Sequence, residues 1–239
     1  VYPPGFDAAR KYPLILEIHG GPHTAYGPHF SAEVQLYAAA GYVVLYANPR
    51  GSTSYGEAFS LEIHHDYPGD DYRDLMSGVD AVIARGFVDE EALYVTGGSG
   101  GGTLTAWIVG KTDRFRAAVV AKPVINWASF TLASDITHFV SQHWFPALPW
   151  EDPDAYWRRS PLSLVAAVTT PTALLTGEAD YRTPMPESEQ YYQALKLQKV
   201  DTALIRIPEA SHGIAKRPSQ LIAKVDNILA WFARYPAPE

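Results

Sequence analysis

A serine flanked by glycines is the residue in this chain whose surroundings say most about chemistry. Ser99 stands within Gly97–Gly101, after the apolar run Leu93–Thr96 and before a helix-like segment over residues 103–108. Between a strand and a helix, this pattern is typical of a nucleophile elbow, a turn so tight that side chains beside the serine would meet neighbouring backbone. Glycine-rich turns of this kind also bind phosphate groups, and some are only tight turns. Other residues must therefore decide whether this serine is a nucleophile.

Two later segments supply the partners that a nucleophilic serine needs. Asp180 follows the apolar run Thr172–Thr176, and His212 follows the run Ala203–Ile207. An imidazole can accept the serine proton near neutral pH, and a carboxylate orients the imidazole and stabilises its cation. The chain order Ser, Asp, His is that of the α/β-hydrolase fold. Glu178 is a second carboxylate in the same loop, and it competes with Asp180 for this role.

The elements that must position these residues alternate along the chain. Short apolar runs, rich in β-branched residues, predict buried parallel strands at Leu14–Ile18, Val43–Ala47, Leu93–Thr96, Ala117–Ala121, Thr172–Thr176 and Ala203–Ile207. Between and after them, residues 75–83 and 221–232 carry apolar side chains at helical spacing, the second behind Pro218. We therefore expect an α/β fold with a mostly parallel sheet and helices on both faces. Ligands of such sheets bind beyond the carboxyl ends of the strands, where the three candidate residues would meet.

Residues 126–161 interrupt this alternation. The segment is rich in aromatic residues and contains three prolines. We expect a partly helical insertion that lies over the sheet, either as a substrate-binding cap or as plain core packing. With no linker, repeat or low-complexity tract, residues 1–239 are predicted to form a single domain.

Composition and charge narrow the function classes. The chain has 239 residues, 47% of them hydrophobic and 19% charged, which is ordinary for a globular protein. A net charge of −7 argues against a nucleic-acid or anionic-membrane partner. The absence of cysteine excludes disulfides, thiolate metal sites and a cysteine nucleophile. We expect a soluble protein, and its compartment, cytoplasm or periplasm, stays open.

With these residues in view, the chain resembles the catalytic domain of the prolyl oligopeptidase family, in particular its acylaminoacyl-peptidase and dipeptidyl-aminopeptidase branch. The resemblance covers nearly the whole chain and implies an α/β-hydrolase fold with Ser99 as nucleophile, Asp180 as orienting acid and His212 as base. It rests on ordered landmarks at residues 19–22, 48–52, 71–75, 97–101, 160–162, 177–184 and 211–213. It favours Asp180 over Glu178, because the family's acid precedes an arginine at this spacing.

The resemblance also implies roles for residues around the triad. The oxyanion hole would use the backbone N–H of Gly100 and the loop that contains His19 and Gly20, with a second donor that is either the imidazole or a loop N–H. Arg182 matches an arginine that contacts a substrate carbonyl in relatives, although it could also simply pair with a nearby acid. Relatives usually carry tyrosine at position 100, so glycine there predicts a wider pocket or a more mobile elbow.

Other polar clusters are weaker candidates. His64–Asp66 resembles a set of metal ligands, but adjacent histidines rarely converge on one ion, and a polar loop is favoured. Asp70, Asp71 and Asp74 stand at the start of a predicted helix, where the helix dipole favours acids over a cation site. Arg50 is interpreted as a structural residue of its loop. The sequence thus predicts no metal and no cofactor.

These observations predict a serine hydrolase that cleaves short peptides through an acyl-enzyme. A carboxylesterase with the same triad is the first alternative, and a non-catalytic binding domain on a hydrolase fold is the second. The expected partner is a short peptide or a small ester, not a nucleic acid or a membrane, and an oligomer is possible. Full-length relatives carry an N-terminal β-propeller that has no counterpart in these residues.

Overall fold

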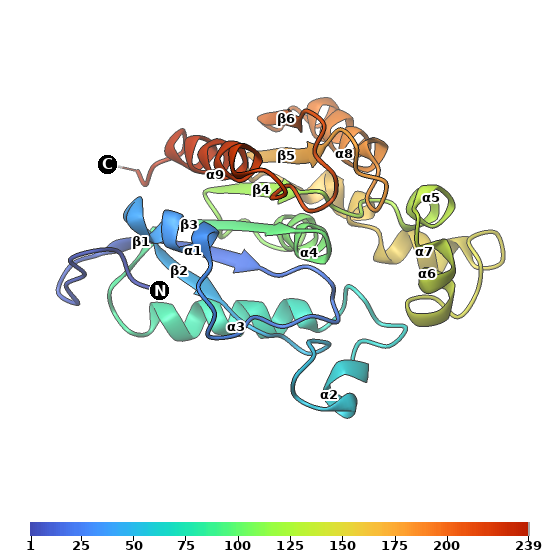
Figure 1. Cartoon of the computed structure of the whole chain (residues 1–239), viewed down its shortest axis with the longest axis horizontal. Helices are drawn as coiled ribbons and strands as arrows, with labels where there is room; N and C mark the ends of the chain where they lie inside the picture. The colour runs from blue at the N-terminus through green and yellow to red at the C-terminus, as the bar shows by residue number, and fades with distance from the viewer. Residues whose placement is uncertain (239) are drawn as a thin grey trace.

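The computed structural model describes residues 1–238, apart from the side chain of Ser141. Within this range, six parallel strands form one sheet in the order β2-β1-β3-β4-β5-β6 (Figure 1). Their bounds are β1 Tyr12–Ile18, β2 Val43–Tyr46, β3 Val88–Gly98, β4 Ala117–Ala121, β5 Thr172–Gly177 and β6 Thr202–Ile207. The predicted parallel α/β architecture is confirmed.

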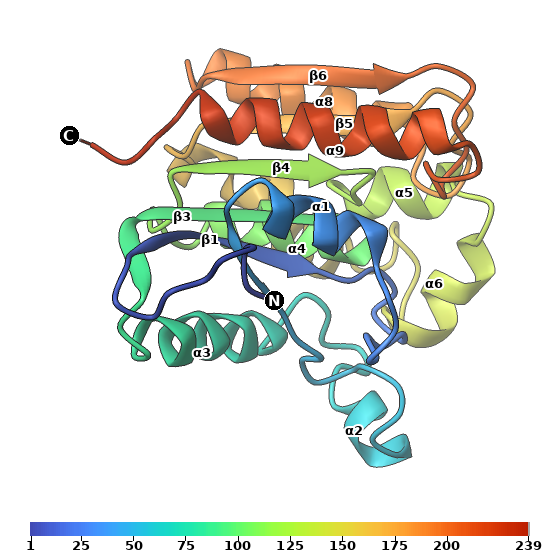
Figure 2. The same ribbon diagram turned by 60° about the vertical axis from the view of Figure 1, so that its left-hand side comes forward.

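Helices cover both faces of this sheet. They are α1 Ala32–Ala39, α2 Glu57–Leu61, α3 Asp71–Ile83, α4 Gly100–Val109, α5 Trp127–Ala133, α6 Thr137–His143, α7 Pro153–Arg159, the 3₁₀ helix η1 Pro161–Ala167, α8 Met185–Leu197 and α9 Pro218–Ala233. Figure 2 shows α1 and α9 in front of the sheet, and their apolar residues share one core. Residues of α3, α4 and α8 pack into the core on the other face. Alternate side chains of β1 enter the two cores, Leu14 and Leu16 on one face and Ile15 on the other.

Each predicted strand lies where the apolar runs indicated, with small shifts at the ends. β3 begins at Val88, five residues before the predicted start, and Ala47 lies outside β2. The periodic segments 75–83 and 221–232 lie in α3 and α9, and Pro218 is the first residue of α9. Residues 126–161 contain α5, α6 and α7, as expected of a partly helical insertion.

Helix α8 has no clear apolar periodicity, because its buried face is partly polar. Glu187 and Ser188 are buried there together with Tyr191 and Leu195. The Glu187 carboxylate accepts hydrogen bonds from the backbone N–H groups of Ile125 and of the residue that follows it. A buried acid satisfied by backbone donors is invisible to a hydrophobic pattern.

The acidic side chains at the start of α3 form hydrogen bonds with other groups of the protein. Asp71 Oδ1 accepts the N–H groups of Gly69 at 2.7 Å and Tyr72 at 3.0 Å. The Asp74 carboxylate accepts hydrogen bonds from the backbone N–H and from the guanidinium of Arg50. Arg50 therefore has the structural role expected of it. Asp71 is 1% exposed, and its Oδ2 has no hydrogen-bond partner among the described residues.

We predict that Asp71 makes the protein less stable as the pH rises. Burial raises the pKa of the Asp71 carboxyl to about 6, from an ordinary value of 3.8. A raised carboxyl pKa favours folding below pH 3.8, and this contribution is lost as the pH rises through 6. The reference protein is Asp71→Asn, which keeps the Oδ1 acceptor but does not titrate. Relative to this variant, the free energy of unfolding of the wild-type protein should therefore fall by roughly 3 kcal/mol between pH 4 and pH 7. Urea unfolding at several pH values measures this difference, and parallel pH curves for the two proteins would contradict it.

Candidate active site

Ser99 stands at the sharp turn between β3 and α4. Its backbone lies at φ 61° and ψ −122°, a conformation that L-residues rarely adopt. The neighbouring glycines are required by close backbone contacts. A Cβ at Gly101 would lie 2.0 Å from the carbonyl oxygen of Ile18, and one at Gly97 would lie 2.6 Å from that of Gly101. The turn is thus as tight as the glycine pattern indicated, and it raises the serine above the carboxyl edge of the sheet.

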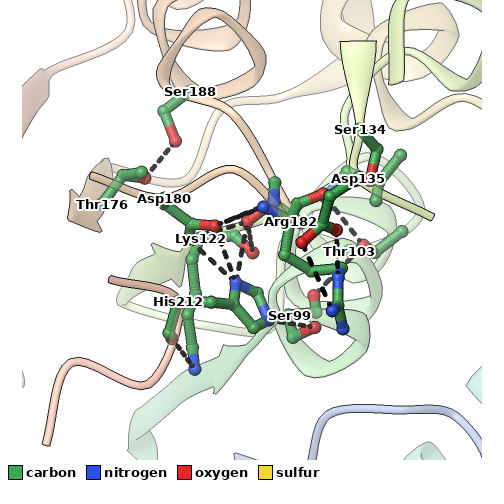
Figure 3. A network of polar contacts seen from close by, with 12 residues as sticks. Ser99, Thr103, Lys122, Ser134, Asp135, Thr176, Asp180, Arg182, Ser188 and His212 are labelled. Atoms are coloured by element: carbon green, nitrogen blue, oxygen red, sulfur yellow. Dashed lines mark hydrogen bonds and ion pairs between the residues drawn. The ribbon is translucent and has the colours of Figure 1, made fainter. Parts of the chain in front are cut away.

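The three candidate residues form one hydrogen-bonded chain. The Ser99 hydroxyl lies 2.9 Å from His212 Nε2, and His212 Nδ1 lies 2.8 Å from Asp180 Oδ2 (Figure 3). They come from loops after β3, β5 and β6, which the parallel sheet brings to one edge. With an ionised carboxylate as acceptor, Nδ1 donates its proton, so Nε2 is free to accept the serine proton. This arrangement can activate a hydroxyl for attack on a carbonyl.

Asp180 is the carboxylate in contact with His212. Its side chain is fully buried, and Oδ1 accepts the backbone N–H groups of Arg182 and Thr183, both at 3.0 Å. Glu178, the alternative acid, points away and pairs with Arg206 at 3.2 Å. The loop geometry therefore fixes the Asp180 carboxylate in one orientation toward the imidazole.

The loop after β1 lies against Ser99 through its backbone. A Cβ at Gly20 would come within 3.0 Å of Ser99 Cβ. The His19 ring has other partners, because Nε2 lies 3.0 Å from Ser52 Oγ and Nδ1 lies 2.9 Å from Thr24 Oγ1. Burial lowers the pKa of His19, which favours the neutral ring. Both ring nitrogens of His19 therefore already have hydrogen-bond partners. The part of this loop that faces Ser99 is its backbone.

Gly100 does not leave an open wall in the pocket. A Cβ there would lie 2.8 Å from the hydroxyl of Tyr67 and 3.0 Å from the carbonyl oxygen of Gly21. The same tyrosine hydroxyl donates to the Gly100 carbonyl at 2.8 Å. Tyr67 thus occupies the space in which a side chain at position 100 would begin, so the pocket is closed at this point and the elbow is held.

A cavity of about 360 Å³ opens beside the Ser99–His212 pair. Its apolar wall comes largely from the insertion, through Trp127, Phe130 and Trp144. Other aromatic residues of the insertion are exposed, among them Trp150 at 66% and Trp157 at 51%. The insertion therefore packs over the core and also lines the cavity, and its role as a substrate-binding cap stays a prediction.

Arg182 lines the same cavity at its polar side. Its Nε donates to Asp135 Oδ1 at 2.5 Å, and both side chains are partly exposed. Asp135 is tied to the same loop, because its N–H donates to the carbonyl of Tyr181. The pairing expected as an alternative is present, and it holds the guanidinium at the cavity.

His64 and His65 do not form a metal site in the structure. Their rings stack on each other with centroids 3.8 Å apart. Within residues 1–238, no group of three His, Cys, Asp or Glu side chains is arranged to hold a metal ion. In the same part of the chain, none of the helices has the length and apolar character needed to cross a membrane.

Comparison with known proteins agrees with this geometry. The sequence matches the prolyl oligopeptidase family over residues 28–238. The chain belongs to the prolyl oligopeptidase family. It is 44% identical to the uncharacterized peptidase YuxL of Bacillus subtilis (strain 168), over 98% of this chain and 36% of that protein.

Solved structures of acylaminoacyl peptidases share the fold. The Pyrococcus horikoshii acylaminoacyl peptidase superposes with a TM-score of 0.93 at 28% identity, over 99% of this chain and 39% of its own. An acylaminoacyl peptidase in complex with Z-Gly-Gly-Phe-chloromethyl ketone gives a TM-score of 0.91 at 29% identity, with the same coverage. The chain thus spans little more than a third of the length of these relatives.

Tyr67 and Lys122 are among the residues of this site that the sequence did not reveal. Tyr67 and Lys122 both line the cavity beside Ser99. Each stands far from the elbow in sequence, and Lys122 directly follows β4, a position that could have signalled it because strand ends build such sites. Tyr67 lies in a loop with no periodic pattern, and only the folded chain brings its hydroxyl to Gly100.

We predict that Gly100→Ala destabilises the protein and impairs the site. The added Cβ would overlap the Tyr67 hydroxyl and crowd the Gly21 carbonyl, which should cost about 1–3 kcal/mol. Gly78→Ala is the matched control, because a Cβ in α3 meets only Leu45 at an ordinary 3.6 Å and alanine favours the helix.

Urea unfolding of the two variants tests the Gly100 prediction. Gly78→Ala should be neutral or stabilising. Adding Tyr67→Phe to Gly100→Ala removes the nearest clash and should restore part of the loss. Equal stability of the Gly100→Ala and Gly78→Ala variants would show that the position is not crowded.

Proposed function

We propose that this chain is the catalytic domain of a serine peptidase that cleaves short peptides through an acyl-enzyme. The observation that carries the proposal is the partly buried, hydrogen-bonded chain from Ser99 through His212 to the buried Asp180, at the mouth of an apolar cavity. Membership of the prolyl oligopeptidase family supports it. A non-catalytic domain would have no need to keep a strained serine aligned with an imidazole and a buried carboxylate.

Each triad residue has one role in this proposal. Ser99 Oγ attacks the substrate carbonyl while its proton passes to His212 Nε2, and Asp180 stabilises the imidazolium that forms. The tetrahedral intermediate collapses, and His212 gives the proton to the leaving amine. Water then repeats the sequence on the acyl-enzyme, so that the acid product is released and Ser99 is restored.

The oxyanion would be held by backbone donors. We assign one to the N–H of Gly100, which opens α4, and the other to the loop that contains His19 and Gly20. The imidazole of His19 is not assigned, because both ring nitrogens have other partners. A negative oxygen at the first turn of α4 is also favoured by the helix dipole.

The cavity suggests the substrate class. Trp127, Phe130 and Trp144 would bury an apolar or aromatic side chain on the acyl side of the scissile bond. The structurally similar acylaminoacyl peptidase bound to a phenylalanyl chloromethyl ketone is consistent with such a pocket. Arg182, held by Asp135, would donate to a substrate carbonyl further from the scissile bond, a task suited to a fixed planar guanidinium.

Covalent labelling tests the nucleophile. A fluorophosphonate probe should label the wild-type protein and not Ser99→Ala, and kcat/KM of the variant should fall by about 10⁴-fold or more. Ser219→Ala, an exposed serine in the first turn of α9, is the matched control and should behave as wild type. Labelling that persists in Ser99→Ala would remove Ser99 from the mechanism.

Substrate series test the reaction class and the pocket. N-acetyl-phenylalanyl p-nitroanilide should be cleaved at least about 10-fold faster than the glutamyl analogue, because burying a carboxylate among aromatic rings is costly. Short p-nitrophenyl esters should also react, since an ester is the easier acyl donor. Turnover of esters with no turnover of any anilide, measured on the full-length protein, would replace the peptidase proposal by an esterase.

A further inference from the structure

Lys122 occupies a junction between the loops that carry the candidate triad. It is the first residue after β4, with φ at 42°, and its N–H donates to the carbonyl of Leu175 in β5. On the other side, the last residue of β4, Ala121, accepts the N–H of Ser99. Lys122 is therefore fixed between the elbow and the strand that precedes Asp180.

The Lys122 side chain reaches the loop that carries the histidine. Its Nζ donates to the backbone carbonyl of His212 at 2.7 Å (Figure 3). Its stem passes close over Gly98, where an added Cβ would lie 2.8 Å from Lys122 Cε. The bare backbone of Gly98 thus leaves the room that the lysine needs to extend to this carbonyl.

Lys122 also contacts the loop that carries the acid. Its carbonyl accepts the hydroxyl of Thr183 at 3.0 Å, and the Thr183 N–H donates to Asp180 Oδ1 at 3.0 Å. One residue therefore bonds to the His212 backbone through its side chain and supports the Asp180 loop through its backbone.

The loop around His212 requires such a support. Glu209 and Ile214, on either side of the histidine, both have positive φ, at 56° and 39°. Residues other than glycine hold such conformations only when their surroundings impose them. The charge-assisted hydrogen bond from Lys122 to the His212 carbonyl is one of the contacts that hold this segment.

The surroundings of Lys122 are charged and largely enclosed. A second cavity of about 220 Å³ lies beside it, lined also by Glu17, Glu33 and Lys224. Burial, followed by the charge of Lys224, lowers the pKa of Lys122 to about 8, against the opposing effect of Asp180 and the two glutamates. Lys224 is paired with Glu33 at 2.6 Å.

We propose that Lys122 is a positioning residue for the hydrolysis, because its ammonium holds the His212 carbonyl and thereby sets Nε2 at hydrogen-bonding distance from Ser99. It touches neither the reacting atoms nor the leaving group. A displacement of about 1 Å at a reacting group can cost roughly 100-fold in rate. Loss of the ammonium should therefore lower the rate of serine acylation and leave substrate binding unchanged.

The variant Lys122→Met tests this role, because it keeps the length of the stem and removes the donor. The second-order rate of fluorophosphonate labelling and kcat per titrated active site should both fall by about 10- to 100-fold, with KM within about twofold of wild type. Lys122→Arg restores a cationic donor and should recover most of the rate. Lys199→Met is the matched control, an exposed lysine that also has positive φ, at 61°, and it should not change either rate.

The positioning role of Lys122 rests on the proposed roles of Ser99 and His212. The experiment distinguishes a failure of the proposed function from a failure of the positioning role. If the wild-type protein is not labelled, the proposed function fails. If Lys122→Met labels and turns over at the wild-type rate per active site, or if Lys122→Arg is as slow as Lys122→Met, the positioning role is overturned. Should Lys122→Met not fold, Lys122→Gln keeps a polar group in the charged surroundings but is one bond too short, and the same losses are expected of it.

Discussion

The close approach of the first turn of α4 to the end of β1 constrains the whole site. The backbone of Gly101 lies so near the carbonyl of Ile18 that no side chain fits between them. This contact bends the chain at Ser99 into positive φ and directs the hydroxyl toward the carboxyl edge of the sheet. It also brings the loop after β1 against the serine, so that Gly20 meets Ser99 Cβ. The proposed nucleophile and its candidate oxyanion donors are thus positioned by one backbone contact.

A parallel sheet supplies the second constraint, because its strands all end at the same edge. Asp180, His212 and Lys122 follow three different strands, and each meets the others only because β4, β5 and β6 are neighbours in register. The contacts that hold them are mainly to backbone groups. Asp180 accepts two N–H groups of its own loop, and the Lys122 ammonium donates to the His212 carbonyl. The site is therefore held by the main chain, which moves less than exposed side chains do.

The strands and the amphipathic helices were predictable because burial on one or both faces imposes a pattern on the residues themselves. A continuous apolar run such as Ala117–Ala121 is typical of a strand that is buried on both faces. Helix α8 lacked that signal, since Glu187 is buried on its inner face and is satisfied by backbone donors of a distant loop. The start of β3 at Val88 was also missed, because Asp89, Glu90 and Glu91 interrupt its apolar pattern.

The sequence by itself determined the sheet, the elbow and the three residues whose types and order suit nucleophilic catalysis. Glycine at 97 and 101 is a local requirement of the turn, and the order of Ser99, Asp180 and His212 follows from the order of the strands. The family resemblance already favoured Asp180 over Glu178, and the structure shows that Asp180 is the one that contacts His212. Only the tertiary structure closed the pocket beside Gly100 with Tyr67 and brought Lys122 to His212. The physical reason is that these contacts join loops distant in sequence, where direction and distance, not residue type, select the partner.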